Sequence, residues 1–191
     1  MIANFKYFPA SAAAIITPQG SYSNTPIQNI ELNMALVENF IFASLQHYVE
    51  LVVFPECLLW QYAEPTRASY RAYSEDIPTS QGLNPCIDFL HLKTWPILKN
   101  ASCWAKTYRV GVVLNMIDFK ACNSSDPNCP ADGFYLYNTD AAFDSTGMML
   151  AIYHKSHIYG TYPYLNQPAV PDNVTFVFNG VTFGMVRVCM R

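Results

Sequence analysis

The sequence predicts an α/β protein, and two observations carry that prediction. Short continuous apolar runs, typical of strands buried inside a sheet, alternate with a stretch whose apolar residues recur every three or four positions, as on one face of a helix. The chain has 191 residues, of which 51% are hydrophobic and 13% are charged, so one domain with a sizeable core can form. We therefore expect a single domain over residues 1–191, whose first half is a strand–helix–strand crossover unit.

The first expected elements are a strand, a helix and a second strand. "SAAAIIT" (11–17) is expected to form the first strand, with a weak signal peptide, interrupted by Pro9, as the alternative. "LVVF" (51–54) is expected to form a strand buried on both faces and ended by Pro55. Between them, residues 27–49 are predicted to form an amphipathic helix because its apolar residues are spaced by three and four: Ile30, Met34, Val37, Ile41, Leu45 and Tyr48.

The rest of the chain is predicted to form an excursion, a helix, a strand and two hairpins. Residues 60–90 are aromatic, contain three prolines and are expected to be irregular. A helix broken at Pro96 (89–107) and a buried strand (109–115) follow. "FYLYNTDAAFDSTGMMLAIYHK" predicts two strands joined by a turn at "DSTG", and "NVTFVFNGVTFGMVRVC" predicts a second pair with Asn179-Gly180 as its turn.

Charge and composition exclude several classes of function. The formal net charge is −3 and no cluster of Lys and Arg occurs, so a nucleic-acid partner is not expected. No apolar run has the length needed to cross a bilayer, so we predict no transmembrane segment. No paired Cys or His motif with zinc-ligand spacing is present, and the sequence predicts neither a metal nor another cofactor. The oligomeric state is left open.

The cysteines and sequons favour a protein made for an oxidising compartment. There are six cysteines, and Cys122 and Cys129 bracket a polar loop in which a disulfide would contribute roughly 2–3 kcal/mol. Cys86 and Cys103, placed around the second helix, form a second candidate pair. Three glycosylation sequons are present, at Asn100, Asn123 and Asn173. We expect a secreted or extracellular glycoprotein; the alternative is a set of reduced core cysteines.

Three chemically reactive side chains follow strand-like runs far apart in the sequence. Glu56 follows "LVVFP", Lys155 follows "MLAIYH" and Cys189 follows "MVRV". The carboxyl ends of strands line the ligand crevice in α/β folds. A carboxylate can take the proton of a thiol, and an ammonium can stabilise an oxyanion, so the three groups together fit acyl transfer from an amide to water. Taken singly, each has an ordinary interpretation: a loop charge, a solvated lysine and a small core residue.

"VVFPE" and "YHK" resemble two catalytic motifs of the nitrilase, or carbon–nitrogen hydrolase, superfamily. The segment "ACNSSDPNCPADGFYLYNTDAAFDSTGMMLAIYHKSHIY" resembles the vanin (pantetheinase) and biotinidase branch, as do "SEDIP" and "NGVTFG". The resemblance implies an α-β-β-α sandwich and a secreted or lipid-anchored amidase for a small-molecule amide, such as pantetheine or a biotin amide. It also implies that Glu56 is the general base, Lys155 stabilises the tetrahedral intermediate and Cys189 forms a thioester.

The chain departs from the pattern of that branch near its end. Gly184 lies five residues before Cys189 instead of four, and a one-residue slip turns a strand side chain to the opposite face unless a bulge absorbs it. Tyr162 stands where the family usually has a second glutamate. We therefore expect a domain that is incomplete at its C-terminus. The alternative to an amidase is a catalytically inactive secreted glycoprotein or pseudoenzyme that retains the first half of the fold. A weaker alternative is a binding module that uses residues 60–90.

Overall fold

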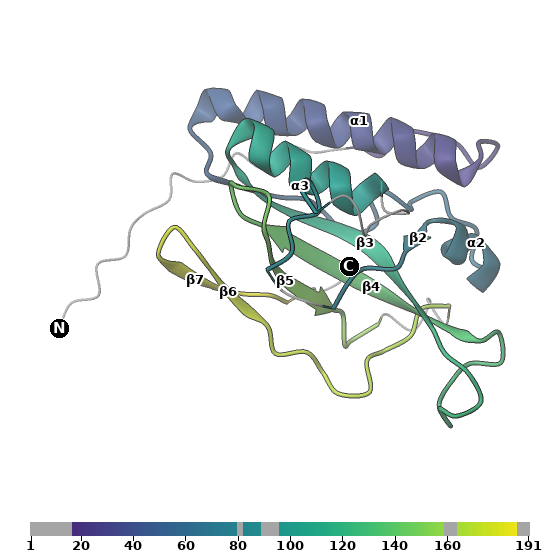
Figure 1. Ribbon diagram of the computed structural model, residues 1–191. Coiled ribbons are helices and arrows are strands. Elements are labelled where there is room, and N and C mark those ends of the chain that lie inside the picture. Colours follow the sequence, from purple (N-terminus) through teal and green to yellow (C-terminus); the bar gives the residue numbers. More distant parts are fainter. Residues whose placement is uncertain (1–16, 80–81, 89–95, 159–163, 187–191) are drawn as a thin grey trace.

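The protein is a mixed sheet with two helices on one face and a β-hairpin on the other (Figure 1). The computed structural model describes residues 17–79, 82–88, 96–158 and 164–186. Its helices are α1 (Pro26–Ser44), followed by a 3-10 turn (Leu45–His47), α2 (Arg67–Ala72) and α3 (Pro96–Tyr108). Its strands are β1 (Leu51–Val53), β2 (Ser74–Glu75), β3 (Gly111–Ala121), β4 (Phe134–Phe143), β5 (Met149–His154), β6 (Thr175–Phe178) and β7 (Val181–Gly184).

Helix α1 confirms the predicted amphipathic helix but ends earlier than expected. Thr25 caps its N-terminus in a reciprocal pair of hydrogen bonds with Gln28. The predicted apolar stripe is buried at Met34 and Val37, among others. Tyr48 does not belong to that stripe, because it adopts a left-handed backbone conformation (φ 55°) just after the 3-10 turn and is 89% exposed.

Strands β1 and β3 form a parallel crossover, which comes later in the chain than the strand–helix–strand unit expected for the first half; the first strand of that unit (11–17) lies largely outside the described residues. They pair in parallel, with Leu51 opposite Gly111, and α3 lies between them in the sequence. The absence of a Cβ at Gly111 matters, since a Cβ there would lie 2.7 Å from Leu51 Cδ1. The expectation that 51–54 is buried on both faces was wrong: Val53 is 59% exposed. The β6–β7 hairpin covers only part of the second face of β1, so Val53 on that face remains accessible to solvent.

Strands β3, β4 and β5 form an antiparallel meander that carries most of the sheet. The predicted pair of strands joined by a turn at "DSTG" is present as β4 and β5. Strand β3 extends beyond the predicted 109–115, and it pairs with β4 from Val112 to Ala121. Ile117 lies opposite Asn138, and the N–H of Lys155 donates to the Asn138 carbonyl (2.8 Å). Since paired residues of antiparallel strands share a face, these three side chains point to the same side.

The β6–β7 hairpin covers part of the face opposite the helices. Its turn has positive φ at both Asn179 (49°) and Gly180 (77°), as the predicted two-residue turn requires. Phe176 and Phe178 are buried and belong to a small apolar cluster that also contains Val113, Ala142 and Ala151 of the main sheet. The hairpin thus forms a second layer on this face of the sheet, and the described part of the chain ends at residue 186, just after β7.

Residues 60–90, expected to be irregular, contain two short elements. Helix α2 is capped by Thr66, and β2 pairs in parallel with β3, with Ser74 opposite Ile117. Elements of six and two residues contain too few repeats to produce a periodic signal in the sequence. Three other expectations lie largely outside the described residues: the strand at 11–17, the start of the helix at 89–107, and the end of the last strand pair.

Candidate active site

Glu56 and Lys155, which are 99 positions apart in the sequence, meet at the carboxyl ends of β1 and β5. The Lys155 ammonium donates to Glu56 Oε1 at 2.7 Å. The Lys155 side chain is 2% exposed and the Glu56 side chain 17%. An ammonium buried this deeply needs a compensating carboxylate, because desolvation of a lone charge is costly. The structure therefore joins the two candidate residues into one buried ion pair with the carboxylate nearer the solvent.

A turn after β1 presents Glu56 to the lysine. Pro55 interrupts the strand, and Cys57 then adopts a left-handed backbone conformation (φ 68°). The N–H of Cys57 donates to Asn115 Oδ1 (3.0 Å), and the indole N–H of Trp60 donates to the same oxygen (3.2 Å). One buried amide oxygen thereby fixes the turn on both sides of the chain reversal.

Asn115 and Asn138 connect that turn to the lysine, and sequence reasoning missed both. Asn138 donates from its amide to Glu56 Oε1 and accepts from the Asn115 amide (2.7 Å). Asn115 is fully buried and its amide also lies 3.1 Å from Asp140 Oδ1. Glu56 Oε1 is thus held by two donors, the Lys155 ammonium and the Asn138 amide. The available signal was polar residues at alternate positions inside apolar strands, which does not by itself distinguish function from packing.

A small cavity lies on the same side of the sheet. It measures about 140 Å³ and is lined by apolar side chains together with the buried carboxylate of Asp140. Val53 and Val113 form its floor on the main sheet, and Phe183 and Met185 belong to the hairpin side. Through Asp140 and Asn115 the cavity is connected by hydrogen bonds to the turn that carries Glu56.

Cys189 lies outside the described residues, so its sulfur is not placed relative to Glu56 and Lys155. The last described residues after β7 are Met185, whose N–H donates to the Val174 carbonyl (2.9 Å), and Val186. Tyr162, the residue at the position of the family's second glutamate, is also outside the described ranges. The described residues contain no group of three or more His, Cys, Asp or Glu side chains that could hold a metal ion.

Of the five cysteines among the described residues, four form disulfides. Cys122 is bonded to Cys129, and Cys86 to Cys103. Cys57 takes part in neither bond and is half-buried. The three sequon asparagines, Asn100, Asn123 and Asn173, are all exposed. Among the described residues, no helix has the length and apolar character needed to cross a membrane.

The chain belongs to the carbon–nitrogen hydrolase family, whose sequence profile matches residues 12–182. Solved structures of that class share the fold. A yeast protein, Saccharomyces cerevisiae Nit3 of branch 10 of the nitrilase superfamily, superposes with a TM-score of 0.55 at 19% identity over 86% of this chain and 50% of its own. An N-terminal amidase crystallised with an Asn-Glu-Ala peptide superposes with a TM-score of 0.54 at 12% identity, over 82% of this chain and 31% of its own.

Within the family, similar curated proteins include pantetheinases and biotinidases. The pantetheinase of Bos taurus is 37% identical over 153 residues, which cover 80% of this chain and 29% of that protein. Human pantetheinase is 34% identical over 174 residues, which cover 90% of this chain and 32% of that protein. The biotinidase of Takifugu rubripes is 31% identical over 154 residues, covering 78% and 30%. These matches confirm the resemblance to the vanin and biotinidase branch, and the chain spans about 30% of the length of these relatives.

Carbon–nitrogen hydrolases, as the name of the family states, cleave bonds between carbon and nitrogen with water. The two disulfides and the pantetheinase and biotinidase relatives together suggest an extracellular protein.

Proposed function

We propose that this chain acts as an amidase of the vanin and biotinidase type, which hydrolyses a linear amide such as that of pantetheine or a biotin amide. The observation that carries the proposal is the buried contact of 2.7 Å between the Lys155 ammonium and Glu56 Oε1. A carboxylate and an ammonium in this arrangement can serve as proton acceptor and as oxyanion stabiliser at one reaction centre.

The proposed reaction uses Glu56, Lys155 and Cys189 in turn. The Cys189 thiol passes its proton to Glu56, and the thiolate attacks the amide carbon. The Lys155 ammonium stabilises the oxyanion of the tetrahedral intermediate. When the intermediate collapses, the C–N bond breaks, and the leaving amine takes the proton from Glu56. A thioester remains on Cys189.

Water completes the cycle in the second half of the reaction. It gives a proton to Glu56 as its oxygen attacks the thioester carbon, and the second tetrahedral intermediate again faces Lys155. Collapse breaks the C–S bond, releases the carboxylic acid and returns the proton to the Cys189 sulfur. No co-reactant other than water is consumed.

A catalytically inactive secreted glycoprotein is the second candidate. The observation that favours it is the spacing in the sequence: Cys189 lies five residues after Gly184, where the family has four. In a regular strand, a slip of one residue reverses the face of the side chains that follow. On either proposal the protein is secreted, and the exposed sequon asparagines Asn100, Asn123 and Asn173 carry glycans. Secretion is tested by the appearance of the chain in culture medium, and glycan occupancy by a mobility shift on deglycosylation.

Turnover assays on the full chain, produced through a secretory pathway, decide between the two functions. We expect hydrolysis of pantetheine or biocytin that is lost in Cys189→Ala and in Glu56→Gln. Cys57→Ser is the matched control, because it removes a half-buried thiol in the same region that has no part in the proposed reaction. Iodoacetamide labelling followed by mass spectrometry should find Cys189 as the reactive thiol.

Absence of turnover on both substrates by a folded chain, together with an unlabelled Cys189, would refute the amidase and favour the inactive glycoprotein. Full activity in Cys189→Ala would refute the assignment of the nucleophile.

A further inference from the structure

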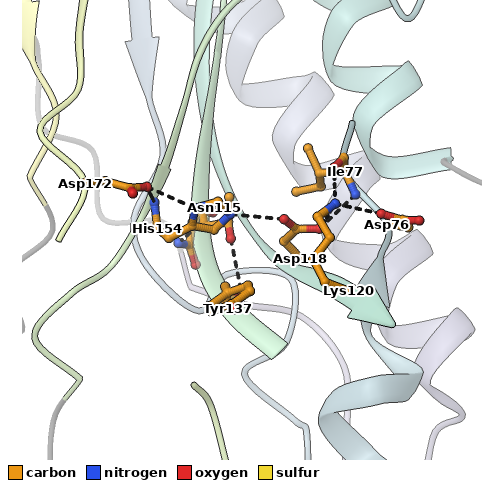
Figure 2. Close-up of polar contacts among 9 residues, drawn as sticks. Asp76, Ile77, Asn115, Asp118, Lys120, Tyr137, His154 and Asp172 are labelled. Carbon is orange, nitrogen blue, oxygen red and sulfur yellow. Dashed lines mark hydrogen bonds and ion pairs between the residues drawn. The ribbon is translucent and has the colours of Figure 1, made fainter. Parts of the chain in front are cut away.

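His154, the neighbour of Lys155 in the sequence, is held between two carboxylates (Figure 2). Its Nε2 lies 3.1 Å from Asp118 Oδ2, and its Nδ1 lies 2.9 Å from Asp172 Oδ2. Its backbone N–H also donates to Asp172 Oδ2, at 2.8 Å. Because an ionised carboxylate can only accept, both contacts are hydrogen bonds when both ring nitrogens carry a proton, which is the imidazolium form.

The surroundings of the ring favour that charge. Asp118 is 1% exposed and also binds the ammonium of Lys120 at 2.9 Å. Lys120 in turn binds Asp76 at 2.6 Å, and the ring of Tyr137 lies 4.9 Å from the His154 ring. With His154 charged, this group of side chains contains three carboxylates and two cations. Loss of the imidazolium proton would leave the carboxylates in excess by two.

The balance of burial and charge agrees with the geometry. Burial is the largest influence on the ring and acts to lower the pKa of His154. The hydrogen bond and charge of Asp118, joined by those of Asp172, outweigh burial and raise this pKa above its ordinary value of 6.5. A raised histidine pKa means that the contribution of the imidazolium to stability is complete below 6.5 and is lost as the pH rises through the folded-state value.

The His154 imidazolium and its two carboxylate partners come from three separate segments of the fold. Asp118 lies in β3, His154 ends β5, and Asp172 lies in the segment that leads to β6. Strand β5 stands at the end of the strand order, so its outer edge has no neighbouring strand among the described residues. Asp172 satisfies the backbone N–H of His154 on that outer edge, while the next N–H, of Lys155, donates inward to β4.

We propose that His154 is a positioning residue: as an imidazolium it fixes the end of β5, and therefore Lys155, relative to the segment that leads to the β6–β7 hairpin. This inference rests on the proposed function for its catalytic consequence and on the geometry for its structural one. Lys155 and His154 are adjacent, so their side chains point to opposite faces of the sheet. Contacts that hold His154 on one face therefore also fix the position of the backbone that carries Lys155 on the other face. Deprotonation of His154 loosens the link and lowers activity on the alkaline side.

The first test is a histidine titration of the full chain by NMR with labelled histidine. The His154 signal is identified by its loss in His154→Gln. Its midpoint should lie above 6.5, and Asp172→Asn should lower it by about one pH unit or more, because one of the two carboxylates is removed. Asp144→Asn is the matched control: the same change in the turn at the other end of β5 should leave the midpoint unchanged. A midpoint at or below 6.5 would overturn the proposal.

The second test is hydrogen–deuterium exchange of the segment 164–186, which needs no turnover. His154→Gln and Asp172→Asn should increase its exchange several-fold while α1 is unaffected. The wild-type protein should show the same increase above the His154 midpoint, after correction for the intrinsic pH dependence of exchange. Unchanged exchange in both variants would overturn the proposal.

The third test uses the amidase reaction. Asp172→Asn should lower kcat roughly tenfold, as small misplacements of catalytic groups do, with KM little changed, and should move the alkaline limb of the kcat profile to lower pH. An unmoved limb would overturn the catalytic part of the inference. If the wild-type chain shows no turnover, the proposed function fails, and the titration and exchange results alone decide whether His154 fixes the end of β5.

Discussion

Replacing Lys155 with methionine should destabilise the protein, because the change removes the cation from a largely buried ion pair. Breaking such a pair typically costs 3–5 kcal/mol, since the remaining charge stays buried without a partner. Here Glu56 keeps 17% of its side-chain exposure and the hydrogen bond from Asn138, so water and an amide partly compensate. We expect a loss near the lower end of that range, about 3 kcal/mol.

The double variant Glu56→Gln with Lys155→Met separates the charge from the packing. Neither residue is then ionised, and the glutamine oxygen can still accept from Asn138. We expect the double variant to regain about 1–2 kcal/mol relative to Lys155→Met alone, because no buried charge remains. The interaction free energy follows from the cycle of the two single variants and the double variant.

Urea unfolding followed by tryptophan fluorescence measures these differences, provided that the slope of the free energy against urea is the same in all variants. Lys106→Met, the same substitution on the exposed side of α3, serves as the control and should change stability by less than about 0.5 kcal/mol. The reasoning is refuted if Lys155→Met stays within about 1 kcal/mol of the wild type, or if the double variant is no more stable than Lys155→Met.

Three further predictions concern the framework of the site. Burial raises the pKa of Glu75 to about 7, although the hydrogen bonds from the first turn of α3 act to lower it. The free energy of unfolding should therefore fall as the pH rises from 4.5 to 7, and denaturation measurements on Glu75→Gln should show a weaker dependence on pH. Asn115→Ala should lower the free energy of unfolding in urea by about 3 kcal/mol or more, because it leaves several buried polar groups without a hydrogen-bond partner. A loss below about 1 kcal/mol would contradict the central role of Asn115. Replacing Cys86 and Cys103 by serine should cost about 3 kcal/mol on the chain-entropy model, measured as a lower unfolding midpoint.

Sequence patterns predicted the large elements because those elements repeat often enough to be recognised. Helix α1 contains several turns with a stripe that includes Met34 and Val37, and the turn of the β6–β7 hairpin has its own residue signature in Asn179-Gly180. Elements α2 and β2 were missed because they are held by tertiary contacts. Arg67, for example, binds Asp132 at 2.5 Å, from a segment 65 positions away.

The meeting of Glu56 and Lys155 followed from their places after strand-like runs and from the family motifs, but the residues that hold them did not. Asn115 and Asn138 are amides inside apolar strands, and only the register of β3 against β4 brings them together. His154 was visible next to Lys155, yet its function depends on carboxylates 36 and 18 positions away in the sequence. A single sequence does not contain that distance information.

The disulfide from Cys86 to Cys103 also changes what protease digestion of the protein would show. The two half-cystines enclose the connection that enters α3, and they are 17 positions apart. A single cut anywhere between them leaves both pieces joined through sulfur. On a gel without reducing agent, cleaved molecules would therefore run with the intact ones, and the cut would show only after reduction or as the mass of one added water.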